Sequence, residues 1–201
     1  MSDIRKGLVY AALNKSAALV DYSDNFHNEH ELRKKMIHAD NSLTNDEKAY
    51  AIRKLNQVYD RYKVRNNEGT KRICENCGQE CLATLYCELC VRNYLKANFP
   101  NWTSGNDDID NLIRKCQMET LEPQKVIEWI PYDKLQNIKY LTEGGCSKIY
   151  TAEWINGRYF EWNSKKQQLI RFGAQLVVLK RLENVENANK RWLEEVRNLN
   201  I

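Results

Sequence analysis

No stretch of this 201-residue sequence approaches the ~18 consecutive apolar residues that a membrane-spanning helix requires. Its first 24 residues also lack the clean apolar core and the small-residue cleavage site of a secretory signal. A transit peptide has few acidic residues, but the first 24 residues here contain Asp3, Asp21 and Asp24. We therefore expect a cytoplasmic protein that has no membrane partner.

An excess of positive charge is missing as well. The sequence has 31 Lys and Arg residues against 27 Asp and Glu residues, and the acids are interspersed among the bases, so the formal net charge is only +4. Proteins dedicated to DNA or RNA usually concentrate Lys and Arg on one face. We therefore expect no nucleic-acid partner, and the length allows one or two domains.

The three histidines have no cysteine beside them. His27, His30 and His38 lie among Asn, Glu and Lys residues, in a region with only a weak helical pattern. Polar residues in such surroundings are mostly exposed. We therefore expect all three to be surface side chains and not metal ligands.

Two later segments have the pattern of amphipathic helices. Thr44 and Glu47 form a capping box, in which a hydroxyl and a carboxylate each satisfy an unpaired backbone N–H. The apolar face of the resulting helix, over residues 44–63, is expected to pack on a neighbour or on a second copy of itself. Asn106 is the expected cap of a second helix over residues 106–118.

Five of the seven cysteines crowd into one segment, which without a secretory signal indicates metal binding in a reducing compartment. Cys74-x-x-Cys77 and Cys87-x-x-Cys90 are two chelating pairs, and each can supply half of a tetrahedral Zn²⁺ site. Four sulfur ligands leave no position for a substrate water, so the zinc would support folding. The spacer is shorter than in most zinc ribbons, and Cys81 could compete as a ligand. Reduced, partly buried thiols without a metal are the alternative.

The last third of the sequence is rich in strand formers. The glycines within residues 143–147 predict a hairpin turn, whose backbone N–H groups could approach a phosphate. Residues 175–180, Gln-Leu-Val-Val-Leu-Lys, predict a strand, and residues 187–199 have the spacing of an amphipathic helix. The long connection at residues 156–173 predicts an additional hairpin.

The order of the glycine turn, the VVLK strand and the WLEEV helix resembles the N-lobe of eukaryotic protein kinases. It is most similar to the tyrosine-kinase-like families expanded in some fungi, in which a short cysteine-rich module and an EWIPY-type segment precede the kinase domain. That segment stands here at residues 128–132, and the resemblance extends from about Ile73 to Ile201. It implies bound ATP and a parent activity of ATP-dependent protein phosphorylation.

The resemblance also implies roles for single residues. Leu141 and Ile149 would enclose the adenine, and Gly144 matches the central glycine of G-x-G-x-x-G. Lys180 matches the lysine that pairs with the α- and β-phosphates, and Glu195 matches the helix glutamate that holds this lysine.

Several positions depart from the kinase pattern. Thr142 and Ser147 replace the first and third glycines of the loop, and Cys146 replaces its usual tip aromatic. Val178 replaces a small residue beside the adenine, and Glu194 is a second candidate for the helix glutamate. The sequence has neither H-R-D-x-x-x-x-N nor D-F-G, so we expect no catalysis by this chain alone and only weak or vestigial ATP binding.

The sequence thus predicts an α+β protein with three regions. Helices occupy residues 1–72, a four-cysteine, zinc-ribbon-like module with its following helix occupies 73–120, and an incomplete kinase-like N-lobe of antiparallel strands and one helix occupies 133–201. The alternative is a non-catalytic, zinc-stapled interaction module or decoy, which would bind a protein partner through the helix at 44–63 or exposed surfaces of the lobe. An in-frame continuation beyond Ile201 that contained H-R-D and D-F-G would restore an enzyme.

Overall fold

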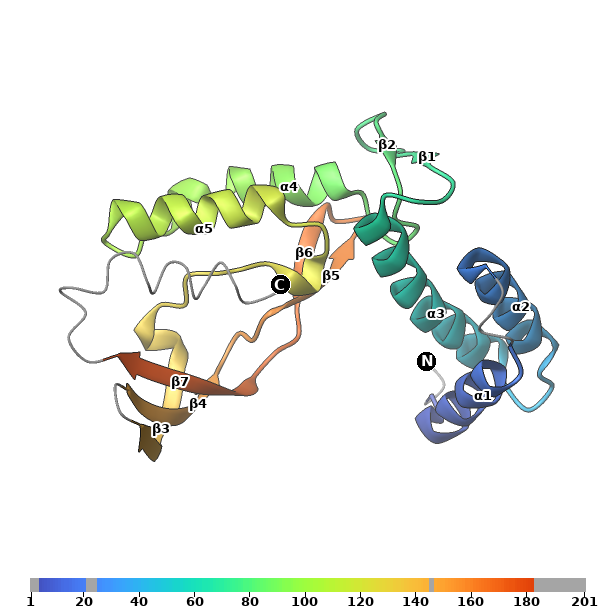
Figure 1. The fold of residues 1–201 in the computed structure, drawn as a ribbon, viewed down its shortest axis with the longest axis horizontal. Helices are drawn as coiled ribbons and strands as arrows, with labels where there is room; N and C mark the ends of the chain where they lie inside the picture. Colours follow the sequence, from blue (N-terminus) through green and yellow to red (C-terminus); the bar gives the residue numbers. More distant parts are fainter. Residues whose placement is uncertain (1–3, 21–24, 145–146, 183–201) are drawn as a thin grey trace. The chain divides into compact units, whose positions relative to one another are not determined.

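The computed structural model describes residues 4–20, 25–144 and 147–182, and it is an α+β structure with small antiparallel sheets (Figure 1). The chain divides into two compact units, Met1–Cys90 and Val91–Ile201. Among the helices of the described ranges, none combines the length and the apolar composition that a bilayer crossing requires. The predicted helix at residues 187–199 lies outside the described residues.

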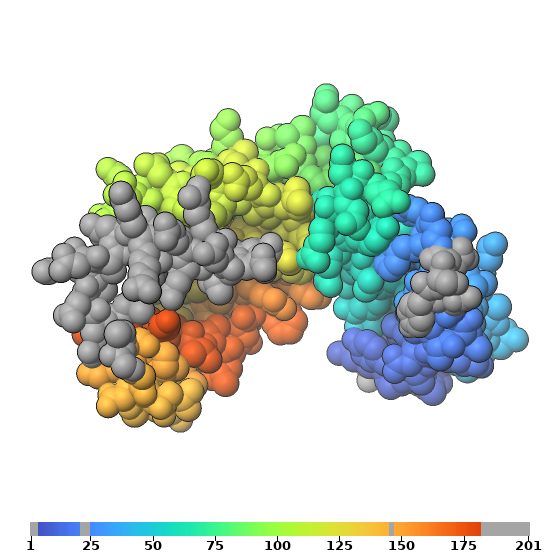
Figure 2. All heavy atoms as spheres, viewed as in Figure 1, coloured from blue at the N-terminus to red at the C-terminus, as the bar shows by residue number. Residues whose placement is uncertain are grey.

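Three helices that contact one another open the first unit: α1 (Lys6–Ala18), α2 (Phe26–Ala39) and α3 (Asn45–Asn66). Figure 2 shows the atoms of α1 and α2, in blue, directly against one another. Their shared core consists of buried apolar side chains: Val9, Ala12, Leu13, Ile37, Leu43, Ala51 and Leu55. The neighbour that the sequence predicts for the apolar face of α3 is therefore supplied by the same chain.

The capping box predicted at the start of α3 is confirmed, and a third residue joins it. The Thr44 hydroxyl accepts a hydrogen bond from the Glu47 N–H, and the Glu47 carboxylate accepts one from the Thr44 N–H. Nε and one terminal nitrogen of Arg5 each lie 2.7 Å from an oxygen of the same carboxylate. These hydrogen bonds, chiefly those from Arg5, hold the pKa of buried Glu47 far below its usual value.

Glu47→Gln is expected to remove an acid-sensitive part of the stability of the first unit. Because the pKa of Glu47 is lowered in the folded state, its carboxylate stabilises the fold above its unfolded-state pKa of about 4.3 and loses this contribution as the pH falls. Stability measured by far-UV circular dichroism should decline steeply below about pH 4 in the wild type and less steeply in Glu47→Gln. Asp46→Asn, an exposed acid in the same helical turn, is the control. Parallel profiles for wild type and Glu47→Gln would contradict the prediction.

The expectation of three exposed histidines is wrong for one of them. His30 is buried, and its ring stacks on that of Tyr59 in α3, with 3.9 Å between centroids and 6° between planes. Burial lowers the pKa of His30 to about 4, so the ring is neutral at pH 7. His38 is exposed, whereas His27 is half-buried with its Nδ1 2.7 Å from the Tyr59 hydroxyl.

The cysteine-rich segment has little regular structure, and helices follow it. Its two short strands, β1 (Arg72–Ile73) and β2 (Glu80–Cys81), pair in antiparallel fashion. The next elements are α4 (Glu88–Ala97), the 3₁₀ turn η1 (Phe99–Asn101) and α5 (Asp107–Glu119). Asn106 caps α5 by accepting hydrogen bonds from the N–H groups of Asp108 and Ile109, so the predicted second helix is confirmed.

The strands predicted in the last third of the sequence form two small antiparallel sheets in the second unit. The preceding turns and the strands are η2 (Pro123–Lys125), η3 (Tyr132–Lys134), β3 (Leu135–Gly144), β4 (Ser147–Trp154), β5 (Tyr159–Asn163), β6 (Gln168–Arg171) and β7 (Gln175–Leu182). One sheet has the order β3-β4-β7, and β5 pairs with β6 as a separate hairpin. Gly144 pairs with Ser147, which confirms the hairpin predicted around residues 143–147. The predicted strand at 175–180 and the extra hairpin within 156–173 are confirmed as well.

A half-buried ion pair connects the EWIPY segment to β6. A terminal nitrogen of Arg171 lies 2.5 Å from a Glu128 oxygen, and the guanidinium lies over the Tyr159 ring at 4.0 Å from its centroid. Burial raises the pKa of Glu128, although Arg171 acts to lower it. The other terminal nitrogen of Arg171 donates a hydrogen bond to the Gly157 carbonyl over 2.7 Å. Gly157 has a φ of +59°, and a Cβ there would lie 1.9 Å from the Gly173 oxygen, so this position requires glycine.

Candidate metal centre

The four cysteines of the two C-x-x-C pairs converge in the first unit. The sulfurs of Cys74, Cys77, Cys87 and Cys90 all lie within 4.8 Å of one another. The Sγ–Sγ distance is 3.7 Å both for Cys74 with Cys90 and for Cys77 with Cys87. Around a tetrahedral zinc ion with Zn–S bonds of about 2.3 Å, sulfurs lie about 3.8 Å apart, whereas a disulfide bond is about 2.05 Å long. The sulfurs are therefore spaced as ligands of one metal ion and not as disulfides.

A tight turn aims backbone N–H groups at the first pair. The Gly78 N–H donates to the Cys74 carbonyl over 2.9 Å, and the Cys74 N–H donates to the Gln79 carbonyl over 2.8 Å. Gly78 has a φ of +69°, which glycine adopts without strain. Burial raises the pKa of the Cys74 thiol, but hydrogen bonds from the N–H groups of Cys77 and Asn76, together with those from the Cys77 and Cys87 side chains, lower it to about 7. The turn thus favours the thiolate, the form of cysteine that binds metals.

The second pair lies at the start of α4. Cys87 directly precedes the helix, and Cys90 lies in its first turn. Both thiols are buried, and burial raises the pKa of each. The Asn76 side-chain amide, from the turn of the first pair, donates to the Cys90 sulfur over 3.5 Å. A cation between the two pairs would supply the positive charge that buried thiolates require.

Cys81 lies beside this set but outside it. Its sulfur forms a second close group with Cys87 and a Glu88 carboxylate oxygen. That carboxylate already accepts hydrogen bonds from the N–H groups of Leu82 and Ala83, at 3.1 and 2.8 Å. Burial raises the pKa of Cys81 to about 12, and it raises the pKa of Cys87 and Cys90 as well, so protonation does not distinguish Cys81 from the ligands. The first set offers four sulfurs, whereas the set with Cys81 offers three ligand atoms, one of them from the hydrogen-bonded Glu88 carboxylate, so the geometry favours the four-cysteine set.

Four charged side chains hold the loop at residues 82–86, which connects the two ligand pairs and which we call the spacer loop. They are Asp60 and Lys63 of α3, Arg72 of β1 and Glu88 of α4. Arg72 donates to the carbonyls of Ala83 and Tyr86 over 2.8 and 2.6 Å. Sequence reasoning missed all four, because most of their partners are backbone groups, up to 25 residues away. On sequence spacing alone, Asp60 and Lys63 look like an ordinary surface pair one helical turn apart.

Of the residues that the kinase resemblance singles out, the structure brings two together. Ile149 and Lys180 are paired directly across β4 and β7, so their side chains share one face of the sheet. Gly144 lies at the end of the β3–β4 hairpin, and Leu141 is an exposed residue at an irregularity in the pairing of β3. Glu195 lies outside the described residues.

The face of the sheet that carries Lys180 is exposed. Leu176 and Val178 alternate along β7 in step with Lys180 and share its face, and they are 77% and 66% exposed. On the opposite face, Ala152 and Trp154 of β4 are buried.

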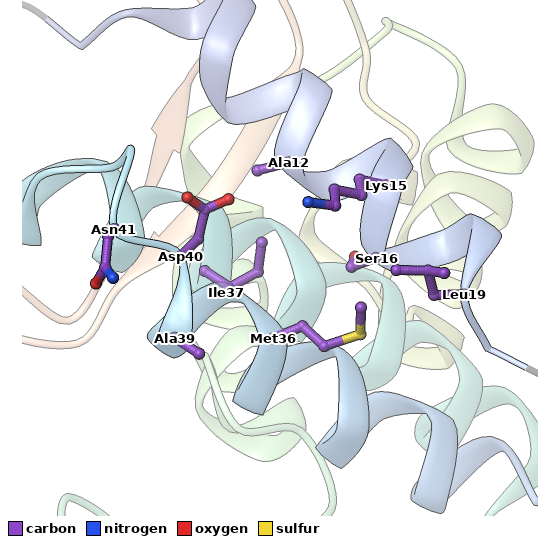
Figure 3. Close-up of a pocket in the computed structure, with 9 residues that line it drawn as sticks. All are labelled: Ala12, Lys15, Ser16, Leu19, Met36, Ile37, Ala39, Asp40 and Asn41. Carbon is purple, nitrogen blue, oxygen red and sulfur yellow. The ribbon is translucent and has the colours of Figure 1, made fainter.

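The first unit also has an open hollow of about 440 Å³ between α1 and α2. Figure 3 shows Lys15 and Leu19 from the side of α1, and Met36 and Ile37 from α2, around this space. Asp40, directly after α2, lies at its edge. The residues that line it include neither the cysteines nor the residues singled out by the kinase resemblance.

Comparisons of the chain with protein-family models, with curated proteins and with solved structures found no match. What the protein does is therefore inferred from its own residues and their geometry.

Proposed function

We propose that the second unit is the opening part of a protein-kinase-like lobe that binds ATP weakly, and that the four-cysteine centre holds a structural zinc ion. The nucleotide proposal is carried by one observation, the Ile149–Lys180 pair on an exposed face of the sheet that contains the β3–β4 hairpin, in which Gly144 pairs with Ser147. The parent activity of such a lobe is transfer of phosphate from ATP to a protein hydroxyl. Because the sequence has neither H-R-D-x-x-x-x-N nor D-F-G, no catalysis is assigned to this chain alone.

In this proposal Lys180 supplies the positive charge for the α- and β-phosphates of ATP. An ammonium group has three donors, and its hydrogen bonds to phosphate oxygens are charge-assisted. Ile149 and Val178, on the same face, would contact the apolar surface of the adenine. Thr142 and Ser147 replace glycines of the loop and keep its backbone further from phosphate, which is why weak affinity is expected.

The zinc proposal is supported by the two 3.7 Å sulfur–sulfur distances and by the N–H groups aimed at Cys74. A site closed by four sulfurs has no coordination position for a substrate water. The zinc would therefore act on folding, because it joins a turn before β2 to the start of α4.

Lys180→Ala is expected to weaken ATP binding tenfold or more, because a hydrogen bond to a charged group contributes about 1.5–3 kcal/mol. The measurement is a titration with ATP and Mg²⁺ followed by tryptophan fluorescence, and all five tryptophans lie in the second unit. Arg181→Ala is the matched control, since this exposed cation is the next residue and lies on the opposite face, paired with Lys148. Equal affinity in wild type and Lys180→Ala, or an equal loss in Arg181→Ala, would refute the nucleotide proposal.

A second candidate function is a non-catalytic interaction module with the zinc as a staple. The observation that favours it is the hollow between α1 and α2, beside which Leu19 is strongly exposed. Exposed apolar side chains around a concave surface are typical of sites for protein partners. One bound zinc ion together with no ATP binding in the titration above would favour this function over the first.

A further inference from the structure

The spacer loop is anchored to helix α3 by two buried side chains that are not metal ligands. We propose that Asp60, together with Lys63, is a positioning residue that sets the zinc affinity of the four-cysteine centre. This inference rests on the structural zinc proposed above. It makes the end of a helix that precedes the cysteines a determinant of metal binding.

Asp60 holds the backbone just ahead of the second ligand pair. Its side chain is 1% exposed, and its two oxygens accept hydrogen bonds from different N–H groups. Oδ1 accepts from the Thr84 N–H over 2.6 Å, and Oδ2 accepts from the Leu85 N–H over 2.8 Å. Leu85 is only two residues before Cys87 in the sequence. Loss of either oxygen therefore removes one of the hydrogen bonds that hold the chain leading into this ligand.

Lys63 completes the anchor one turn later on α3. Its Nζ donates to the Leu82 carbonyl and to the Thr84 hydroxyl, the latter over 3.1 Å. It also lies 3.4 Å from an Asp60 oxygen, and both members of this pair are buried, so each charge compensates the other. Lys63 thus fixes the start of the spacer loop, and Asp60 fixes its end.

Metal affinity depends on how well the ligands are ordered before the metal arrives. Nine residues separate Cys77 from Cys87, and the strands of this segment, β1 and β2, have only two residues each. Side-chain anchors therefore take over the ordering role that a larger sheet would have. Residues that orient metal ligands without touching the metal typically change metal affinity by roughly 10–100-fold. By linkage, zinc that binds the ordered loop also stabilises the end of α3.

The test compares zinc affinity in full-length wild type, Asp60→Asn and Glu47→Gln, by competition with a chromophoric chelator. Asparagine has nearly the shape of Asp60, but its NH₂ group would face a backbone N–H and cannot accept a hydrogen bond from it. The zinc Kd of Asp60→Asn should therefore be roughly 10–100-fold higher than that of the wild type. The Glu47 carboxylate accepts hydrogen bonds from Arg5 and from the Thr44 N–H at the other end of α3. Glu47→Gln therefore lowers the stability of the same helix and should leave the Kd close to that of the wild type.

Substitution of cobalt(II) for zinc adds a measurement of the coordination geometry, which a general loss of stability does not change. The visible absorption bands of cobalt(II) report the coordination geometry, which is tetrahedral with four thiolates. The bands per bound cobalt should change in Asp60→Asn and stay as in the wild type in Glu47→Gln. If Asp60→Asn does not fold, Lys63→Met carries the same expectation, because it keeps most of the apolar stem and removes the donor.

The outcomes separate this inference from the metal site on which it rests. A wild type that binds no zinc overturns both. A wild type that binds zinc, with an unchanged Kd in Asp60→Asn or an equal loss in Glu47→Gln, overturns the positioning role alone.

Discussion

Replacement of both Cys74 and Cys87 by serine is expected to abolish zinc binding and to unfold the cysteine-rich segment. Each substitution removes one thiolate from one chelating pair. A structural zinc ion contributes on the order of 10–16 kcal/mol in zinc-finger peptides, which is comparable with the whole stability of a small domain, about 5–15 kcal/mol. Elemental analysis should find one zinc ion per wild-type chain and none in the double variant.

Limited trypsin digestion can locate the loss of structure. The Arg72 side chain is held by two carbonyls of the spacer loop, so cleavage after it requires local unfolding. The zinc-loaded wild type should resist this cut, whereas the double variant and the chelator-treated wild type should be cut rapidly. Cys116→Ser removes a thiol outside the centre and should keep both the zinc and the resistance. Undiminished zinc in Cys74→Ser/Cys87→Ser would exclude the four-cysteine site.

Arg171→Leu is expected to lower the free energy of unfolding of the second unit by about 1.5–3 kcal/mol, the usual contribution of hydrogen bonds to a charged group. Removal of Arg171 from this half-buried pair leaves the Glu128 carboxylate, which is only 10% exposed, without its partner. The substitution also removes the stacking on Tyr159 and the hydrogen bond to the Gly157 carbonyl. Urea unfolding followed by tryptophan fluorescence measures this loss, because all five tryptophans lie in this unit.

Two further variants separate the effect of breaking the Arg171–Glu128 pair from a general effect of losing a cation. Lys134→Leu breaks the exposed Lys134–Asp133 pair and should cost less than about 1 kcal/mol. Arg171→Leu combined with Glu128→Leu removes both charges and should recover part of the loss. Since burial raises the pKa of Glu128, the cost of Arg171→Leu alone should shrink at acidic pH, where the carboxyl takes up a proton. A cost no larger than that of Lys134→Leu would show that the pair contributes little.

The features that the sequence predicted correctly are local ones. The capping box depends on Thr44 and Glu47, three residues apart, and the turn of the first cysteine pair depends on residues 74–78. The β3–β4 hairpin likewise depends on a short glycine-containing turn. In each case the spacing of the side chains determines which backbone groups they can reach. The kinase-like roles of Leu141 and Lys180 stay predictions, because pairing in a sheet does not by itself identify a ligand.

The features that the sequence could not show depend on partners far along the chain. Asp60 accepts hydrogen bonds from N–H groups 24 and 25 residues later, and Arg171 pairs with a carboxylate 43 residues earlier. Every residue except proline has a backbone N–H, so no pattern marks the one that a distant carboxylate will meet. His30 is a similar case, because its burial is decided by Tyr59 on another helix and not by its polar neighbours in the sequence.

The anchors of the spacer loop have a consequence for how this region can diverge among related sequences. Apart from the Thr84 hydroxyl, the groups that Asp60, Lys63, Arg72 and Glu88 hold are backbone N–H and carbonyl groups. Any substitution in the spacer loop other than proline keeps its backbone N–H and carbonyl groups. The packing of the loop's buried side chains therefore mainly determines which residues its positions can take. The four anchoring residues cannot change in this way, because they act through their charged side chains. Homologues should therefore be recognised less by the letters of the loop than by charged residues at fixed distances from the cysteines.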